Sequence, residues 1–193
     1  GATIFDFARD EGRIVATETA DLVEFGYLAA SSRLGVHLER RGLTRVHGVG
    51  IESEGRGALL LAPSGGGKST IARALRRHTR VRVLGDDLVL LDARGRMLPF
   101  PTPLGLTTPE QADGLGAPIP FPRRLHPPKW VVSVSSDPAR DARDPVDLAW
   151  VVLLTRAHGE AVRMTPAPRT AIASALFRDA VVGLGLPQVL ELI

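Results

Sequence analysis

The segment LLLAPSGGGKSTIARALRRH, residues 59–78, joins an apolar run to three consecutive glycines and a helix-forming stretch. This order is typical of a phosphate-binding loop, whose pattern is G-x-x-x-x-G-K-[ST]. Counting back from Gly67-Lys68-Ser69 puts the first glycine of the pattern at position 62, where this chain has Ala62. The departure leaves two interpretations: a nucleotide site that tolerates alanine, or a glycine turn that holds a lysine by coincidence.

The surroundings of the loop favour the nucleotide site. The apolar run GALLLA at 57–62 would deliver the chain to it as a buried strand. Gly65, Gly66 and Gly67 allow the positive φ angles that turn successive backbone N–H groups toward one anion. A helix over 68–78 would then direct its unpaired N–H groups and its dipole at the phosphates.

Two side chains of the loop gain a role under this interpretation. Lys68 would reach the terminal phosphates, and the hydroxyl of Ser69 would ligate Mg²⁺. Ala62 would cost roughly 1–2 kcal/mol only if its φ had to be positive. A turn that merely caps a helix would not explain why Lys68, Ser69 and Thr70 follow the glycines. We therefore predict a nucleotide phosphate site.

The composition predicts a single globular domain over 1–193. The chain is 44% hydrophobic and 23% charged, and its 24 basic and 21 acidic residues leave a net charge of +3. So small a charge is weak support for a nucleic-acid partner, and we expect none. The longest apolar run, 58–62, is too short to span a bilayer, and cysteine is absent. We also expect no signal peptide before the first element. We therefore expect no membrane partner and a cytoplasmic protein.

Strand-like and helix-like segments alternate, which predicts an α/β fold with a mixed central sheet and flanking helices. Residues 99–128, rich in proline and glycine, are predicted to be an irregular functional loop region with one short helix. The apolar patterns predict helices at 20–41, 68–78, 165–182 and 186–193, and strands at 3–7, 13–17, 44–52, 57–62, 81–84, 129–134 and 148–155, with two more strands around the turn ARGR.

Two adjacent carboxylates, Asp86 and Asp87, follow one helix after Lys68, at the end of the apolar run VRVL. The strand over 81–84 is expected to return beside the loop strand and to bring both close to the γ-phosphate. Adjacent side chains on an extended segment point in opposite directions, so we expect one to hold Mg²⁺ and the other to accept the proton of an attacking hydroxyl. Gly-Asp-Asp is also ordinary turn composition. His47, on a strand expected to pair next to the loop strand, is either structural or part of the site.

Together, VHGVGIESEGRGALLLAPSGGGKSTIARAL and VRVLGDDLVLL resemble the catalytic domain of the HPr kinase/phosphorylase family and its smaller relatives. The resemblance covers roughly residues 44–92, which would form the nucleotide-binding core: a histidine strand, a glycine-lysine-serine loop, and an aspartate pair one helix later. It implies a P-loop kinase with the fold of ATP-dependent phosphoenolpyruvate carboxykinase, which transfers phosphate from ATP to a serine hydroxyl. It also implies a possible homo-oligomer.

The same resemblance implies roles for individual residues, with ATP and Mg²⁺ as the cofactors. Asp86 is the proton acceptor, Asp87 joins Ser69 at the metal, and His47 lies near the γ-phosphate, although the two aspartates could exchange roles. Lys68 completes the catalytic set. The phosphates would be bound by Ser64, Gly65, Gly66, Gly67, Lys68, Ser69 and Thr70.

The acceptor is less well determined, because the chain departs from the full enzyme of that family. No counterpart of its E-[IV]-R-G segment follows the aspartate pair, and its N-terminal domain has no counterpart either. These departures favour a serine of another peptide or protein, such as a natural-product precursor peptide, over HPr itself. A kinase of a small hydroxyl compound and a non-catalytic ATP-binding regulatory module remain the alternatives.

Basic residues elsewhere could also reach the site. Arg123, Arg124, His126 and Lys129 follow the proline-rich region, and Arg156 follows a strand. An arginine or lysine over the site would stabilise the charge that develops during phosphoryl transfer, whereas the alternative for this group is a solvated basic loop. Trp130 and Trp150 are expected to pack in the core or at its edge.

Overall fold

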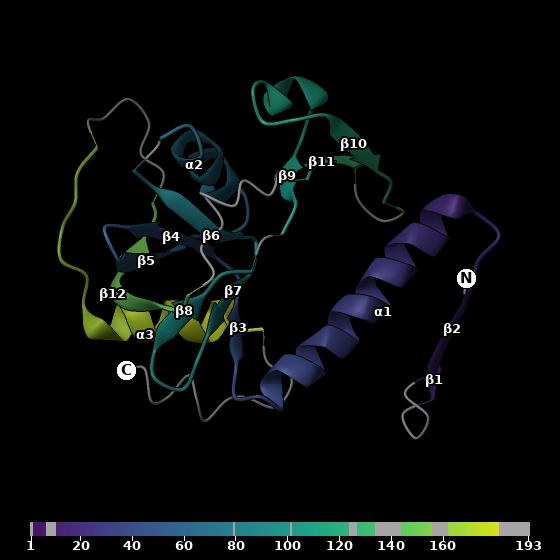
Figure 1. The fold of residues 1–193 in the computed structure, drawn as a ribbon, viewed down its shortest axis with the longest axis horizontal. Helices are drawn as coiled ribbons and strands as arrows, with labels where there is room; N and C mark the ends of the chain where they lie inside the picture. The colour runs from purple at the N-terminus through teal and green to yellow at the C-terminus, as the bar shows by residue number, and fades with distance from the viewer. Residues whose placement is uncertain are drawn as a thin grey trace.

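The computed structural model describes residues 2–6, 11–78, 80–100, 102–123, 127–133, 144–155 and 162–181, and the side chains of all of these except 2–6. A mixed seven-stranded sheet lies at the centre, with helices against both faces (Figure 1). The α/β class with a mixed central sheet and flanking helices is therefore confirmed. Among the helices within these ranges, none has the length and apolarity needed to cross a bilayer.

The described elements have the following bounds. The helices are α1 Thr19–Glu39, α2 Lys68–Leu75, α3 Arg169–Asp179 and the short 3-10 helix η1 Pro109–Ala112. The strands are β1 Ala2–Asp6, β2 Glu11–Val15, β3 Thr44–Val46, β4 Val49–Ser53, β5 Arg56–Leu61, β6 Arg82–Asp86, β7 Val89–Leu91, β8 Arg96–Leu98, β9 Leu104–Leu106, β10 Pro118–Phe121, β11 Lys129–Val132 and β12 Val146–Leu153.

The strands of the central sheet lie in the order β3-β7-β8-β12-β5-β4-β6. β5 and β12 run parallel, and the other neighbouring pairs are antiparallel. Residues 57–61 of β5 are all buried, because this strand is covered on both faces. Leu59 and Leu61 pack in one core cluster with Leu176 of α3, and Leu60 packs in the cluster that holds Ala72 of α2. β5 therefore connects the two halves of the core and delivers the chain to the glycine loop.

A second, three-stranded sheet in the order β10-β11-β9 lies on the α2 side of the central sheet. One of its faces contributes Leu104, Leu106 and Val132 to the core around α2. The region 99–128 is therefore more ordered than predicted, because it contains β9, η1 and β10. Their strands are short, and β10 includes two prolines, so no period-two pattern is visible in the sequence.

The helix α1 lies apart from the central sheet, with the β1–β2 hairpin on its far side (Figure 1). Its last turn leads into β3, which it contacts. Tyr27 lies in the first half of α1, and its ring contacts the ring of Phe121 on β10 edge to face, with the centroids 5.5 Å apart. α1 therefore contacts the body through Tyr27 and through its last turn.

Two predictions about the sheet need correction. Residues 44–52 form two strands, since the chain bends at His47-Gly48 and β3 pairs with β7 whereas β4 pairs with β5 and β6. β6 does not lie directly beside the loop strand β5, because β4 runs between them. The helix predicted at 186–193 lies outside the described residues.

Candidate functional site

Two glycines of the loop between β5 and α2 have left-handed backbone angles. Gly65 has φ of 75° and Gly67 has φ of 91°, a region that costs other residues about 1–2 kcal/mol. Gly66 is required for a different reason: a Cβ there would lie 2.7 Å from the Cβ of Ala62 and 2.9 Å from the carbonyl oxygen of Pro63. The N–H of Gly66 donates to that same carbonyl at 2.9 Å.

Ala62, the departure from the motif, is accommodated without strain. It is 2% exposed and does not have a positive φ; among the described non-glycine residues only Glu54 and Asp87 do. Its methyl group fills the space that Gly66 leaves open. The steric penalty considered for alanine therefore does not arise.

The loop ends at Gly67, which is the N-cap of α2. No side chain of the described residues caps this end of the helix, so its first N–H groups have no intrahelical acceptor. Ser64 and Thr70, at the two ends of the predicted phosphate-binding segment, are exposed. The arrangement provides exposed polar groups around an N-terminus that attracts negative charge.

Lys68 is the first residue of α2 and is 7% exposed. Its Nζ donates to the carbonyl oxygen of Ala62 at 2.6 Å and lies 3.4 Å from that of Pro63. Lys68, which the sequence predicts to reach the terminal phosphates, therefore also holds the two ends of its own loop together. An incoming phosphate would have to replace these carbonyl partners.

Ser69 and Asp86 come together across α2 and β6. The hydroxyl of Ser69 donates to Oδ1 of Asp86 at 3.3 Å. Asp86 is 1% exposed, and its Oδ2 is buried without a hydrogen-bond partner in the described part of the chain. Burial, and then the charge of Asp87, raise the pKa of Asp86, whereas the Ser69 hydrogen bond and the charge of Arg76 act in the opposite direction. A buried, unpartnered carboxylate oxygen beside a hydroxyl is a suitable oxygen pair for a hard cation.

Asp87 has different surroundings from Asp86, as expected, but not because the two side chains alternate along a strand. It does not continue the strand: its φ is 71°, and its side chain is 63% exposed. Nδ1 of His47 lies 3.2 Å from Oδ1 of Asp87 and 2.9 Å from its carbonyl oxygen. His47 sits in the bend between β3 and β4. The two carboxylates therefore divide into a buried one at the loop and an exposed one at the histidine.

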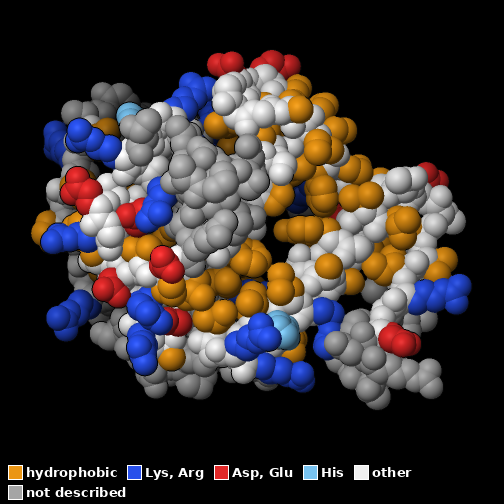
Figure 2. All heavy atoms as spheres, viewed as in Figure 1, with side chains coloured by type: hydrophobic (Ala, Val, Ile, Leu, Met, Phe, Trp, Pro, Cys, Tyr) orange, Lys and Arg blue, Asp and Glu red, His pale blue; other side chains and the backbone are white. Residues whose placement is uncertain are grey.

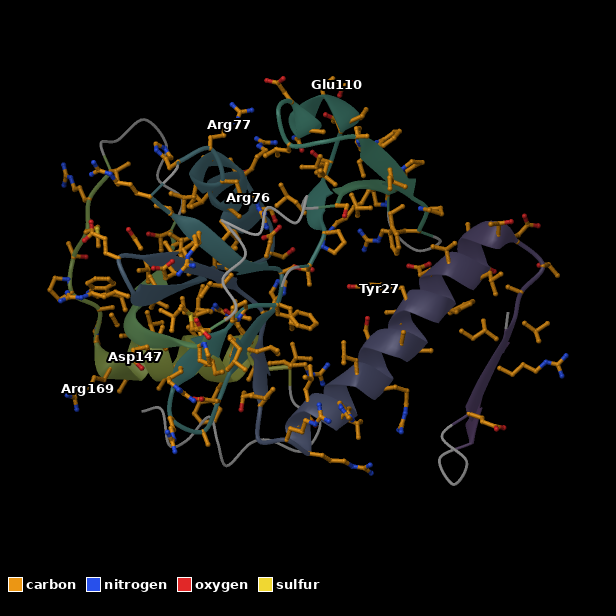
Figure 3. The ribbon with its side chains drawn as sticks, viewed as in Figure 1. Tyr27, Arg76, Arg77, Glu110, Asp147 and Arg169 are labelled. Atoms are coloured by element: carbon orange, nitrogen blue, oxygen red, sulfur yellow. The ribbon has the colours of Figure 1, made fainter. Side chains whose placement is uncertain are left out.

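Two further residues near Asp86 escaped the sequence analysis. The hydroxyl of Thr102 donates a short hydrogen bond to the backbone carbonyl of Asp86. Arg76 ends α2 (Figure 3), and burial lowers its pKa while the charge of Asp86 raises it. Arg76 could have been found from its spacing, since it lies on the helix face of Ser69 and Ala72. Thr102 lies in the region read as irregular and carried no signal.

The remaining predicted residues are less closely connected with the site. Arg124, His126 and Arg156 lie outside the described residues. Arg123 is half-buried, and Lys129 is exposed at the start of β11. Trp130 packs against the core cluster around α2, as expected. Trp150 does not pack in this way: it is 52% exposed, and the guanidinium of Arg56 lies 5.9 Å from its ring centroid.

No family model, curated protein or solved structure matches this chain.

Proposed function

We propose that this chain is a P-loop kinase that transfers the γ-phosphoryl group of ATP to a hydroxyl group, that of a serine in a peptide or protein. One observation supports this above all: Asp86 is buried beside Ser69, at the end of a glycine loop, with one oxygen unpartnered. Burying a carboxylate without a partner costs free energy, and such an arrangement is typical of a site that serves a ligand. The resemblance in 44–92 to the HPr kinase family points to the same activity.

Asp86 and Ser69 would hold Mg²⁺, because they offer adjacent oxygens and one of these lacks a partner. When bound, the ion neutralises charge on the phosphate oxygens. The sequence left open which aspartate is the metal partner. The hydrogen bond between Ser69 and Asp86 favours Asp86 for that role, since Asp87 is turned toward His47 instead.

The loop would bind the phosphates through its backbone N–H groups and Lys68. The left-handed φ angles of Gly65 and Gly67 support this role, and the N–H of Gly66 would exchange its bond to the Pro63 carbonyl for one to a phosphate oxygen. The ammonium of Lys68 already lies within the loop. It needs only to exchange two carbonyl oxygens for phosphate oxygens, so it is positioned before the nucleotide arrives.

Asp87 would accept the proton of the acceptor, with His47 holding the carboxylate in place. The hydroxyl oxygen attacks the γ-phosphorus and forms a new O–P bond, while the bond from that phosphorus to the bridging oxygen of ADP breaks. The hydroxyl proton passes to Oδ of Asp87, and ADP leaves. The exposure of Asp87 allows an acceptor to reach it, and a positioned base typically contributes about 10²–10⁴-fold in rate.

The test is transfer of label from γ-labelled ATP to serine peptides in the presence of Mg²⁺. Asp87→Asn is expected to lower transfer about a hundredfold or more while leaving ATP affinity, measured by calorimetry, nearly unchanged. Asp86→Asn and Lys68→Ala are expected to remove transfer and to weaken Mg²⁺-ATP binding.

A matched control is Asp113→Asn, since the Asp113 side chain is 88% exposed on a different element. Undiminished transfer by Asp86→Asn and Lys68→Ala would disprove the kinase. ATP binding without transfer to any peptide or small hydroxyl compound would favour the regulatory module, and transfer to the small compounds alone would favour the small-molecule kinase.

A further inference from the structure

One side of α1 carries partly exposed apolar residues along much of its length, and of these Tyr27 contacts Phe121 of β10. Val23, Tyr27, Ala30 and Leu34 follow one another at intervals of four, three and four residues, so they lie in one stripe. Val23 is 38% exposed, Tyr27 56% and Leu34 42%. Tyr27 extends from α1 toward the body of the molecule (Figure 3). The stripe therefore faces the space between α1 and the body.

The opposite wall of that space is the outer face of the β10-β11-β9 sheet. Ile119 pairs across the strands with Val131, and Phe121 pairs with Lys129, so these four side chains share one face. The alternate residues of β11 turn to the core. Ile119 is 56% exposed. Apolar side chains lie on both sides of the hollow between α1 and the body (Figure 2), which we call the α1–β10 groove.

Both walls of the groove lead to the candidate catalytic pair. α1 ends at Glu39 and continues through β3 directly into His47. On the other side, β9 begins two residues after Thr102, whose hydroxyl bonds the backbone of Asp86. A chain segment lying in the groove would thus have one end beside His47 and Asp87, where the attacking hydroxyl is required.

We propose that the α1–β10 groove binds the acceptor, and that the acceptor is an extended peptide segment with apolar side chains next to its serine. This rests on the proposed function. Continuity with the His47–Asp87 pair identifies the occupant as the acceptor, and the apolar walls select a peptide over a sugar or another polyhydroxylated compound. The stripe from Val23 to Leu34 spans about 17 Å, which suits roughly five residues of extended chain.

The groove would recognise side chains and not backbone. Its strand β10 contains Pro118 and Pro120, which have no N–H group to offer to an added strand. Affinity would come from apolar side chains of the peptide that bury the exposed parts of Tyr27, Leu34 and Ile119. Lys129 adds a cation at the edge of this face.

The experiment uses two peptides of equal length with a central serine, one flanked by leucines and one by glutamines, both with lysines at the ends. Binding of the fluorescein-labelled leucine peptide is measured by polarisation without nucleotide, and transfer is measured with γ-labelled ATP. We expect the leucine peptide to bind, and to be phosphorylated with a kcat/KM about tenfold or more above that of the glutamine peptide.

The variant Ile119→Glu is expected to weaken leucine-peptide binding and to lower kcat/KM about tenfold, with ATP affinity unchanged. The matched control Val162→Glu makes the same change at a position that is 98% exposed and outside the groove.

Equal peptide affinity and kcat/KM of the two variants, or of the two peptides, would overturn the proposed acceptor groove without contradicting the kinase activity. Peptide binding that depends on Ile119 but leads to no transfer would show that the groove binds peptides and would overturn its role as the acceptor site. A shift from dimer to monomer in Ile119→Glu, measured by sedimentation, would assign the groove to a second copy and overturn the proposal.

Discussion

The close contact between Ala62 and Gly66 makes a sharp prediction about the loop. In Gly66→Ala, the added methyl group would lie 2.7 Å from the Cβ of Ala62 and 2.9 Å from the carbonyl oxygen of Pro63. Both distances are well inside the roughly 3.5–4.0 Å of a normal contact. The substitution should therefore lower the free energy of unfolding by about 1–3 kcal/mol, the usual range for overpacking.

A second substitution, Ala62→Gly, tests whether the contact with the Ala62 methyl group causes the loss of stability in Gly66→Ala. Alone it removes a buried methyl group and adds backbone freedom, for a loss of about 1–2 kcal/mol. In the double variant the contact between the two methyl groups cannot occur, and only the clash with the Pro63 oxygen remains. We expect the double variant to be more stable than the sum of the single losses by about 1 kcal/mol, a coupling typical of residues in contact.

The assay is urea unfolding of the single and double variants, with Gly65→Ala as the control. A Cβ at Gly65 would meet no described atom within 4 Å, and the cost there comes from its φ of 75°. Ala62→Gly should therefore leave the cost of Gly65→Ala unchanged while reducing that of Gly66→Ala. Equal costs of Gly66→Ala in the two backgrounds would refute the packing argument.

Three other substitutions test the electrostatics and the lysine. Asp86→Asn is expected to raise the melting temperature at mildly alkaline pH. Burial and the neighbouring charge of Asp87 raise the pKa of Asp86, so the ionised form of this carboxyl destabilises the fold. The gain in melting temperature should vanish as the pH falls through that raised pKa. Lys68→Met is expected to lower the free energy of unfolding by about 1–3 kcal/mol, since the Ala62 carbonyl loses the lysine as donor and the Pro63 carbonyl keeps only the N–H of Gly66. Glu52→Gln should destabilise most at neutral pH. Burial acts to raise the pKa of Glu52, but the hydrogen bonds from Arg82 and from the backbone N–H of Gly55, together with the charge of Arg82, lower it overall. The contribution of these interactions is therefore lost as the pH falls through the lowered pKa.

Each of these has a contrary outcome. A melting temperature for Asp86→Asn below that of the parent chain at alkaline pH would mean that the buried carboxylate is stabilising. A Lys68→Met variant as stable as the parent in urea would show that the lysine does not hold the loop together. Melting temperatures of Glu52→Gln equal to those of the parent chain at every pH would show that the pair of Glu52 and Arg82 does not stabilise this end of the sheet.

The loop was predictable because all of its determinants lie within twenty residues. Strand, glycines and helix follow in order, and the φ values of Gly65 and Gly67 agree with the anion-binding geometry inferred from the motif. Asp86 was also expected to lie close to the loop, and it does lie beside Ser69. The strand arrangement predicted for it was wrong, since β4 separates β6 from the loop strand β5. The groove was not predicted, because its walls come from α1 and from short, proline-containing strands whose pairing depends on distant residues.

The sequence by itself determined where the glycine turn and the start of α2 lie, because φ preferences of glycine and the start of a helix are local properties of the chain. Only the tertiary structure decided how the two aspartates differ. The pairing of Asp86 with Val49 and its hydrogen bond from Thr102 place one carboxylate in the interior, while the positive φ of the next residue turns the other to His47 and solvent. Burial results from contacts between segments far apart in the chain, so no local pattern encodes it.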